Sequence, residues 1–283
     1  MTLSPFSERV RRAFGRRVAS YEPMAPLQRS MAWRLAGVAA HQRAGSALAL
    51  PAGPCADLGA GTGLVGRALA AWRFPLPAPL GQLDLCPESL ARNGAGPTLP
   101  WDLNQGLPPH LRGAALLTSS FALQWLEAPA AALAHWGDHL APGGWLLLAV
   151  PTAGSFPEWR LAARRTGLPC SALPLPAADT LLAAATLAGL EVLRARVLTF
   201  SGHGWRSGPR AGPGGGSAHP ALGALRALRA IGADATPQGT SLAPGAWRQL
   251  LAAWPAGGHL SWEVLLLLAR KSPAAAPAPG GLP

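Results

Sequence analysis

Residues 56–66 read ADLGAGTGLVG, in which Gly59, Gly61, Gly63 and Gly66 follow a lone acid, Asp57. Glycine adopts backbone angles that other residues avoid, and it leaves no Cβ between the main chain and a ligand. The pattern is typical of a strand that turns sharply into a helix. We therefore predict that a nucleotide-like ligand lies directly on this stretch of backbone.

Two classes of ligand compete for this loop. The segment 61–66 satisfies the dinucleotide pattern G-x-G-x-x-G, and Asp84 follows at about the ~20-residue offset expected of a ribose-binding acid. A carboxylate at the mouth of the loop would repel a pyrophosphate, but it would attract a sulfonium ligand with an amino-acid tail. Asp57 therefore favours the cationic ligand, while an NAD-type coenzyme and a purely structural turn remain the alternatives.

The run of Asp57, Gly59, Gly61 and Gly63 resembles the first motif of class I S-adenosylmethionine-dependent methyltransferases. This resemblance implies that S-adenosylmethionine is the ligand. It also implies that Asp84 holds the ribose hydroxyls.

The bulk composition indicates a protein with a large core. Of 283 residues, 49% are hydrophobic and 13% are charged, so apolar surface is available for burial. The net charge is +11, but the basic residues do not form the runs typical of a nucleic-acid-binding tract, so we expect no nucleic-acid partner. An acidic macromolecular partner is compatible with this charge.

Cysteine spacing and apolar runs indicate the compartment. Cys55, Cys86 and Cys170 lie far apart, which predicts neither a disulfide framework nor a metal site. The first residues lack the apolar segment of a signal peptide, and no apolar run reaches the ~20 residues that span a bilayer. We expect a cytoplasmic protein without a membrane segment.

Strands and helices alternate through the first two thirds of the chain. We predict strands at 51–58, 81–85, just before 101, 114–120 and 145–150, with helices at 62–72, from 87, at 129–140 and at 176–190. This alternation favours an α/β Rossmann-like fold with a mostly parallel, doubly wound sheet. Two later strands, at 192–200 and 260–269, lack that rhythm and predict an antiparallel pair at the C-terminal edge of the sheet.

We expect a single domain over residues 1–271 and a disordered tail at 272–283. Residues 1–45 form an N-terminal helical lid, 201–220 a flexible Gly/Pro-rich loop, and 221–233 a substrate-side helix.

Two side chains on these helices allow a structural and a functional interpretation. Tyr21 either packs into the core or belongs to the substrate site. Arg229 shares the leucine side of its helix, with Arg226 close to the same stripe, so it either extends past the core edge or points into an anion-binding cavity.

Several stretches together resemble the malonyl-[acyl-carrier protein] O-methyltransferases of biotin synthesis. The resemblance covers the segments 13–16, 21–22, 27–28, 57–63, 83–85, 102, 122–125, 154–158, 228–233 and 260–270. The signatures LQW at 123–125, GSFPE at 154–158 and IGA at 231–233 are the most specific. Ala115 and Ser120 depart from the family, which usually has aspartate and asparagine there.

The resemblance implies methyl transfer from S-adenosylmethionine to the free carboxylate of malonyl-acyl carrier protein, or of malonyl-CoA, giving the methyl ester that primes pimeloyl synthesis. A carboxylate is ionised at pH 7, so neither a general base nor a metal is needed. The alternatives are methylation of another small-molecule carboxylate or hydroxyl, and a non-catalytic protein that binds S-adenosylmethionine.

Each implied role falls on a residue of this chain. Tyr21 closes the site, and Arg229 clamps the malonyl carboxylate because a planar guanidinium fits that group. The donor-binding residues are Asp57, Gly59, Gly61, Gly63, Asp84, Leu85, Asp102, Leu103, Ser120 and Gln124. Within this set Asp57 and the glycines hold the amino-acid end, Asp84 the ribose and Asp102 the adenine; Asp102 as a simple turn residue is the alternative.

Overall fold

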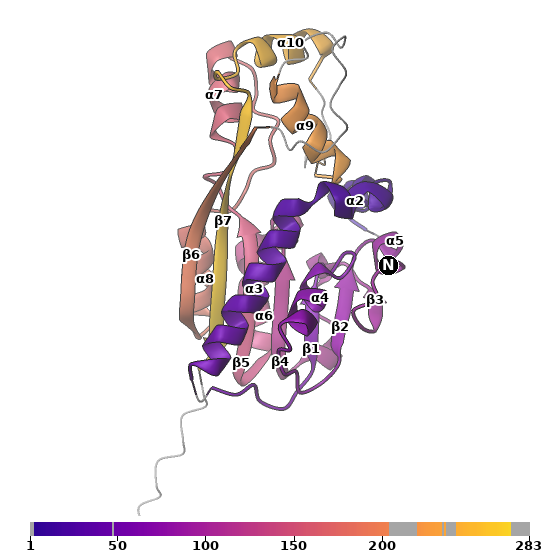
Figure 1. Cartoon of the computed structure of the whole chain (residues 1–283), viewed down its shortest axis with the longest axis vertical. Coiled ribbons are helices and arrows are strands. Elements are labelled where there is room, and N and C mark those ends of the chain that lie inside the picture. Colours follow the sequence, from indigo (N-terminus) through magenta and orange to yellow (C-terminus); the bar gives the residue numbers. More distant parts are fainter. Residues whose placement is uncertain (1–2, 47, 204–219, 234, 236–241, 273–283) are drawn as a thin grey trace, which may run out of the picture.

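The structure is a computed structural model that describes residues 3–46, 48–203, 220–233, 235 and 242–272 (Figure 1). The helices are α1 (Pro5–Gly15), α2 (Val18–Met24), α3 (Pro26–Ala44), α4 (Leu64–Ala71), α5 (Pro87–Leu90), α6 (Pro129–His139), α7 (Pro157–Thr166), α8 (Ala178–Leu187), α9 (Pro220–Ala230) and α10 (Pro244–Ala252). The strands are β1 (Cys55–Leu58), β2 (Leu80–Asp84), β3 (Thr98–Pro100), β4 (Ala114–Ser120), β5 (Leu140–Pro151), β6 (Leu190–His203) and β7 (His259–Lys271). Short 3₁₀ turns are η1 (Leu103–Gln105), η2 (Pro109–Leu111) and η3 (Leu123–Trp125).

Within the described residues the strands form one seven-stranded sheet in the order β3-β2-β1-β4-β5-β7-β6. The pairs from β3 to β5 are parallel, whereas β7 runs antiparallel to both β5 and β6. This arrangement confirms the predicted doubly wound sheet with an antiparallel pair at its C-terminal edge.

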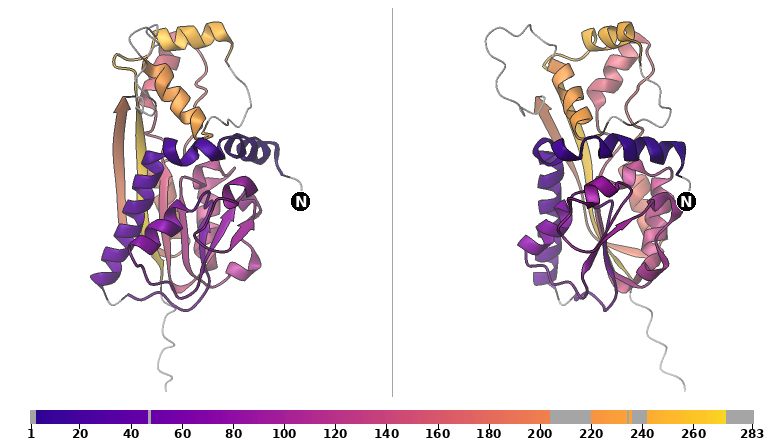
Figure 2. Two further views of the ribbon diagram at one scale, coloured as in Figure 1. Left: turned by 45° about the vertical axis from the view of Figure 1, so that its right-hand side comes forward. Right: turned by 90° about the vertical axis from the view of Figure 1, so that its right-hand side faces the viewer.

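Helices cover both faces of the sheet (Figure 2). On one face α3 and α4 pack against each other and over β4 and β5, and on the other face α6 packs against α8. Strand β5 is buried from Gly143 to Pro151, as expected of a central strand covered on both sides. The sheet thus separates two hydrophobic cores, one on each of its faces.

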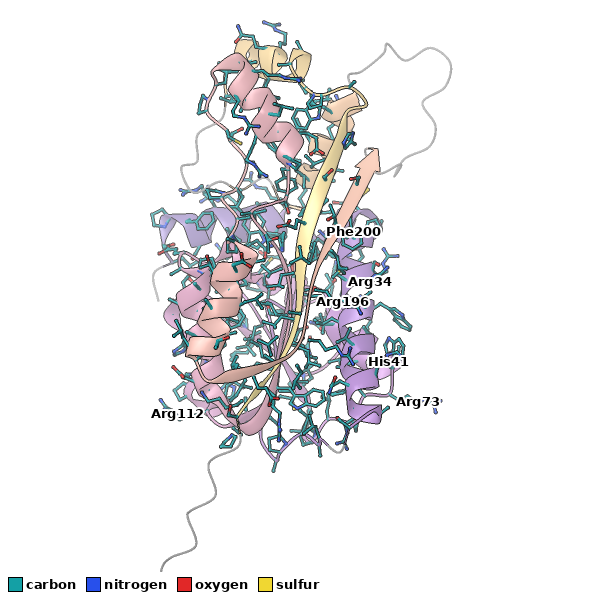
Figure 3. All side chains as sticks on the ribbon, turned by 90° about the vertical axis from the view of Figure 1, so that its left-hand side faces the viewer. Arg34, His41, Arg73, Arg112, Arg196 and Phe200 are labelled. Carbon is teal, nitrogen blue, oxygen red and sulfur yellow. The ribbon has the colours of Figure 1, made fainter. Side chains whose placement is uncertain are left out.

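The carboxyl ends of the parallel strands face a cap built from other helices. Figures 1 and 2 show α1 and α2 lying across this end of the sheet, with α7, α9 and α10 beyond them. Strand β6 forms one lateral edge of the sheet and lies beside α3 (Figure 3). There Arg194 of β6 donates a hydrogen bond to Gln42 of α3 at 3.3 Å.

The structure also corrects several predicted boundaries. The predicted N-terminal helical lid consists of three helices, α1, α2 and α3, because the chain breaks near residue 17 and at Ala25 before Pro26. Helix α7 begins at Pro157 and α10 at Pro244, and neither helix was predicted. Of the predicted flexible loop at 201–220 and the predicted tail at 272–283, residues 204–219 and 273–283 lie outside the described residues.

Candidate active site

The glycine loop joins β1 to α4 at the carboxyl end of the sheet. Gly59, Gly61 and Gly63 have φ angles of +74°, +52° and +86°, in the left-handed region that glycine tolerates. A Cβ on Gly59 would lie 2.1 Å from the Cβ of Ala122, and one on Gly63 would lie 2.5 Å from Oδ1 of Asn93. The loop therefore needs glycine both for its backbone angles and for its close approach to neighbouring segments.

Asp84, the last residue of β2, ties this loop to the neighbouring strand. Its Oδ2 accepts a hydrogen bond from the backbone N–H of Gly61 at 2.8 Å, and its Oδ1 accepts one from Cys86 N–H at 2.7 Å. Burial raises the pKa of Asp84, although both hydrogen bonds lower it. Each carboxylate oxygen has a second lone pair, so the group remains able to accept hydroxyl donors from a ribose.

Asp57 lies beneath the glycine loop on β1 and not at its mouth, where the sequence analysis placed it. The side chain is 1% exposed, and among the described residues neither carboxylate oxygen has a hydrogen-bond partner. Burial, with a smaller contribution from the charge of Asp84, raises the pKa of Asp57 from 3.8 to about 8. Without a bound cation, Asp57 is therefore mainly protonated at neutral pH.

Other buried polar atoms, on β4 and in η3, also have no hydrogen-bond partner within the described residues. They are Thr118 Oγ1, Ser120 Oγ and Gln124 Oε1, of which Thr118 is paired with Asp57 across β1 and β4. Buried polar groups are normally hydrogen-bonded, so these unpaired atoms indicate a partner that the described part of the chain does not supply. The charged amino group of a ligand would fit the carboxylate of Asp57 and the amide oxygen of Gln124, whereas a pyrophosphate would be repelled by that carboxylate once it is ionised.

Asp102 and Leu103 lie at the start of the turn η1. Oδ1 of Asp102 accepts hydrogen bonds from the backbone N–H of Asn104 at 3.0 Å and from its side-chain amide at 3.2 Å. Asp102 thus has the turn-capping role that was the alternative in the sequence analysis. Its proposed contact with adenine stays a prediction.

A cavity of about 90 Å³ brings most of the predicted donor residues together. Its lining includes Tyr21, Gly59, Gly61, Asp84, Leu85, Asp102, Leu103 and Ser120. Val10, Arg11, Phe14 and Val18 from α1 and α2 close its other side. The volume is below the ~300 Å³ at which ligand pockets begin, so a nucleoside would need a more open arrangement of the walls, to which these two helices contribute.

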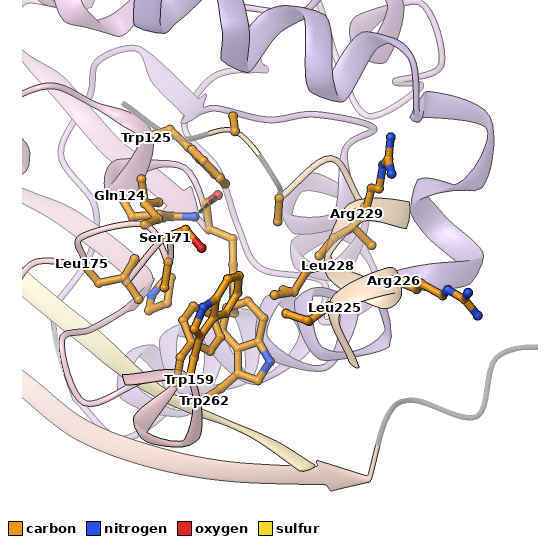
Figure 4. Close-up of a pocket in the computed structure, with 18 of the residues that line it drawn as sticks. Gln124, Trp125, Trp159, Ser171, Leu175, Leu225, Arg226, Leu228, Arg229 and Trp262 are labelled. Carbon is orange, nitrogen blue, oxygen red and sulfur yellow. Dashed lines mark hydrogen bonds between the residues drawn. The ribbon is translucent and has the colours of Figure 1, made fainter. Parts of the chain in front are cut away.

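A second cavity of about 610 Å³ lies beside the first (Figure 4). Phe14, Tyr21, Phe121 and Trp125 line both cavities, so the two meet at these four rings. The walls of the larger cavity are mainly apolar and aromatic; they include Phe156, Trp159, Leu175, Leu225, Leu228, Trp247 and Trp262. Gln124 also lines this cavity, and its Nε2 donates to the carbonyl of Phe121 at 2.7 Å.

Tyr21 occupies the junction of the two cavities. Its ring centroid lies 6.4 Å from that of Phe14, which in turn lies 5.4 Å from the ring of Trp125. Burial, followed by the charges of Asp84 and Glu22, raises the pKa of the Tyr21 hydroxyl above its usual value. The hydroxyl is therefore protonated at physiological pH and is able to donate a hydrogen bond.

Three arginines border the larger cavity: Arg9 of α1 and both Arg226 and Arg229 of α9. Arg226 and Arg229 are exposed. Figure 4 shows their guanidinium groups pointing away from Trp159 and Trp262. Arg229 as the clamp of an acceptor carboxylate stays a prediction.

The structure separates the predicted residues into three groups. Tyr21 and the donor residues named above share the smaller cavity, Gln124 and Arg229 line the larger one, and neither Asp57 nor Gly63 is among the lining residues.

The sequence analysis did not assign site roles to Arg9, Phe14, Trp125, Trp159 or Trp262. Phe14 lies seven residues before Tyr21, a spacing that would place both on one face of a continuous helix, so it was identifiable in principle although the two residues belong to α1 and α2; no local pattern marks Trp262.

In the part of the chain that the structure describes, no group of three or more His, Cys, Asp or Glu side chains is arranged to hold a metal ion. None of the helices in that part has the length and apolarity needed to cross a membrane.

Comparison with known sequences gives a consistent picture. The family described as "Methyltransferase domain" matches residues 28–195. The malonyl-[acyl-carrier protein] O-methyltransferase of Alcanivorax borkumensis is 29% identical over 284 aligned positions, which cover 92% of this chain and 85% of that protein. The biotin biosynthesis bifunctional protein BioCD of Bordetella avium is 39% identical over 122 positions, 41% of this chain and 26% of that protein.

Other similarities are broader. A trans-aconitate 2-methyltransferase of Streptomyces coelicolor is 40% identical over 124 positions, 40% of each protein. Among solved structures, a Bacillus halodurans protein assigned to the methyltransferases superposes with a TM-score of 0.54 at 15% identity, covering 84% of this chain and 97% of that one. At that level of identity the superposition establishes the fold alone.

Proposed function

Because the chain belongs to the methyltransferase domain family, we propose that this S-adenosylmethionine-dependent methyltransferase esterifies the free carboxylate of a malonyl thioester carried on acyl carrier protein. The observation that carries the proposal is the pair of cavities that meet at Tyr21, Phe14, Phe121 and Trp125. The similarity to the malonyl-[acyl-carrier protein] O-methyltransferase of Alcanivorax borkumensis over 92% of this chain supports it.

We assign the smaller cavity to the methyl donor and the larger one to the acceptor. The smaller one is lined by Gly59, Gly61 and Asp84 and by the unpaired hydroxyl of Ser120, and Asp57 beneath the glycine loop would attract the amino-acid end of a methyl donor. The larger one has room for a thioester and the arm that carries it, with Arg9, Arg226 and Arg229 along its border. A malonyl group reaching in from the larger cavity would bring its carboxylate to the junction, where the methyl group has to be presented.

The chemistry needs positioning more than proton transfer. S-adenosylmethionine supplies a methyl group on a positively charged sulfur, and a carboxylate is already ionised at pH 7. Holding two reactants in line contributes about 7–11 kcal/mol to such a step. Tyr21 and the aromatic rings at the junction would exclude water and orient the carboxylate. Arg229 would hold one carboxylate oxygen and leave the other free to attack.

A second acceptor is favoured by one specific observation, the 40% identity to a trans-aconitate 2-methyltransferase over 124 positions. That match covers less than half of this chain, whereas the malonyl-[acyl-carrier protein] relative matches 92% of it. The aromatic walls of the larger cavity also suit a thioester arm better than a small tricarboxylate. We therefore place malonyl thioesters first and trans-aconitate second.

The test is a methyl-transfer assay with four acceptors: malonyl-acyl carrier protein, malonyl-CoA, free malonate and trans-aconitate. We expect transfer to the two thioesters, with the carrier-protein form preferred, and little transfer to the free acids. Transfer to trans-aconitate alone would replace the proposal with the second candidate. Donor binding without transfer to any of the four acceptors would contradict both.

A thermal-shift comparison tests the choice of donor. S-adenosylmethionine or S-adenosylhomocysteine should raise the unfolding midpoint, because ligands that bind only the folded state stabilise it by mass action. NAD at the same concentration should not. Stabilisation by NAD alone would contradict the assignment of the glycine loop to a cationic donor.

A further inference from the structure

The segment 152–158 carries the GSFPE signature. Within it only Phe156 lines a cavity, the larger one. It connects β5 to α7 and lies against the first half of β7. Its backbone follows β7 closely, because Thr152 N–H donates to the carbonyl of Glu263 at 2.8 Å and Phe156 N–H donates to that of Ser261 at 2.7 Å. The signature therefore needs another physical explanation.

Glu158 is the acid of this segment that contacts β7. It is the second residue of α7, and its carboxylate reaches across to β7 instead of capping its own helix. Oε2 accepts from the backbone N–H of Ser261 at 3.0 Å, and Oε1 accepts from the Ser261 hydroxyl at 2.6 Å. His259 Nε2 lies 3.2 Å from the same Oε1.

The centre of this cluster is buried, and its margin reaches the surface at His259 and Ser201. Glu158 and Ser261 are each 7% exposed, and the Ser261 hydroxyl also pairs with that of Ser201 on β6 at 3.0 Å. Ser261 thus gives its N–H and hydroxyl to Glu158 and receives the N–H of Phe156. Hydrogen bonds to an ionised group are about twice as strong as neutral ones, so the carboxylate fixes β7 firmly at this point.

The residues next to this cluster form a wall of the larger cavity. Phe156 and Trp262 have ring centroids 4.7 Å apart, and Trp262 lies 5.8 Å from Phe121 at the junction of the cavities. Trp159, one residue after Glu158, lies 6.5 Å from Phe156. Phe156 also has a φ of +61°, an uncommon backbone angle for a bulky residue, which surrounding contacts must hold in place.

We infer that Glu158 is a positioning residue that sets acceptor binding, by holding Phe156, Trp159 and Trp262 as a fixed wall of the acceptor cavity. It touches neither donor nor acceptor and acts only through Ser261 and the aromatic rings. The inference rests on the proposed function, since it takes the larger cavity as the acceptor site. Replacement of Glu158 should leave the affinity for the donor unchanged, because the donor cavity lies on the far side of Phe121.

The experiment compares Glu158→Ala and Glu158→Gln with the wild-type protein. For Glu158→Ala we expect the KM for malonyl-acyl carrier protein to rise about tenfold, because two buried donors of Ser261 lose their acceptor. The dissociation constant of S-adenosylhomocysteine should stay within about twofold, as expected for sites that share no contact. Glu158→Gln should recover most of the acceptor KM, since an amide accepts from the Ser261 N–H and donates to its hydroxyl oxygen.

A matched control separates positioning from general loss of stability. Leu133→Ala removes a fully buried side chain from the core on the opposite face of the sheet. It should lower the unfolding midpoint without raising the acceptor KM. An equal rise of the acceptor KM in Leu133→Ala, or equal losses of donor and acceptor binding in Glu158→Ala, would overturn the inference.

A spectroscopic readout keeps the inference independent of the substrate. Near-ultraviolet circular dichroism reports on the fixed geometry of packed aromatic rings. Its signal should fall in Glu158→Ala and persist in Leu133→Ala, with far-ultraviolet spectra unchanged in both. If the wild-type protein methylates no malonyl thioester, the proposed function fails, and this spectrum alone decides whether Glu158 holds the wall. An unchanged near-ultraviolet spectrum in Glu158→Ala would overturn the inference in either case.

Discussion

At the scale of single residues, Asp57 is the group whose environment is most unusual. It combines 1% exposure with two carboxylate oxygens that have no partner among the described residues. A buried carboxylate in this state is costly when charged, and it is relieved by protonation or by a cation. Asp57 therefore couples the charge of the ligand to the stability of the fold.

Replacing Asp57 with Asn should separate these two effects. Above pH 8 the ligand-free variant should unfold at a higher temperature than the wild type, because it carries no buried charge. Its affinity for S-adenosylmethionine should fall about tenfold or more, because a charged hydrogen-bond acceptor is lost. Asp138→Asn, at a side chain that is 70% exposed, is the matched control and should change neither quantity. Unchanged donor affinity in Asp57→Asn would contradict the role of this carboxylate.

The raised pKa of Asp57 predicts a direction for the pH dependence of donor binding. The cationic donor favours the ionised carboxylate, so its affinity should increase as the pH rises toward about 8, whereas at higher pH the loss of the proton from the donor's α-amino group opposes this gain. Calorimetric titration at pH 6, 7, 8 and 9 in ~0.1 M salt measures this directly. Donor binding near pH 7 should also release a proton, which appears as a binding enthalpy that depends on the buffer.

The same group affects the stability of the ligand-free protein. The folded-state pKa of about 8 lies above the ordinary value of 3.8, so between these limits the folded protein binds more protons at Asp57 than the unfolded chain does. The contribution of Asp57 to the free energy of unfolding should therefore decrease as the pH rises from about 4 to about 8. Asp57→Asn should remove this slope, and denaturant unfolding of both proteins across that range is the measurement.

At the scale of elements, the glycine loop should be more sensitive to steric contact than to backbone strain. Gly59 and Gly113 both have a φ of +74°, but a Cβ on Gly59 would meet that of Ala122, whereas one on Gly113 would meet nothing within 4 Å. Gly59→Ala should therefore abolish donor binding, whereas Gly113→Ala should cost only about 1 kcal/mol of stability. Equal behaviour of the two variants in donor titration and thermal unfolding would contradict this assignment.

The elements predicted well are those whose signal is local. The buried run before Ser120 and the glycines after Asp57 predict strand, turn and helix from a few neighbouring residues. Segment α7 escaped prediction because its start depends on contacts of Phe156 and Glu158 with β7, about a hundred residues later. Local periodicity carries no information on such pairs.

The same distinction applies to the site. The donor residues lie at strand ends, and parallel topology brings strand ends together, so Asp84 and Gly61 were identifiable from the sequence. The depth of Asp57 was not, because burial depends on the packing of neighbouring strands. Trp159 of α7 and Trp262 of β7 form the aromatic wall together, and no sequence motif indicates that these two elements are in contact.

At the scale of the whole molecule, α1 and α2 lie over a donor cavity too small for a nucleoside. Phe14 and Tyr21 on these helices line both cavities, so we expect a ligand in either cavity to contact them. Hydrogen–deuterium exchange should show α1 and α2 protected when S-adenosylhomocysteine binds, with β6 at the far edge unchanged. Equal protection throughout the chain, or none in α1 and α2, would contradict a lid role for these helices.

The position of β7 has a consequence for how the protein is made. The strand occupies residues 259–271, yet it lies between β5 and β6 in the sheet. While the nascent chain is still emerging from the ribosome, β6 has no neighbour to pair with, and the apolar margin of β5 is open to unwanted association. Synthesis must therefore pass Lys271 before the sheet can close, and a chain stopped short of His259 should be a client for chaperones.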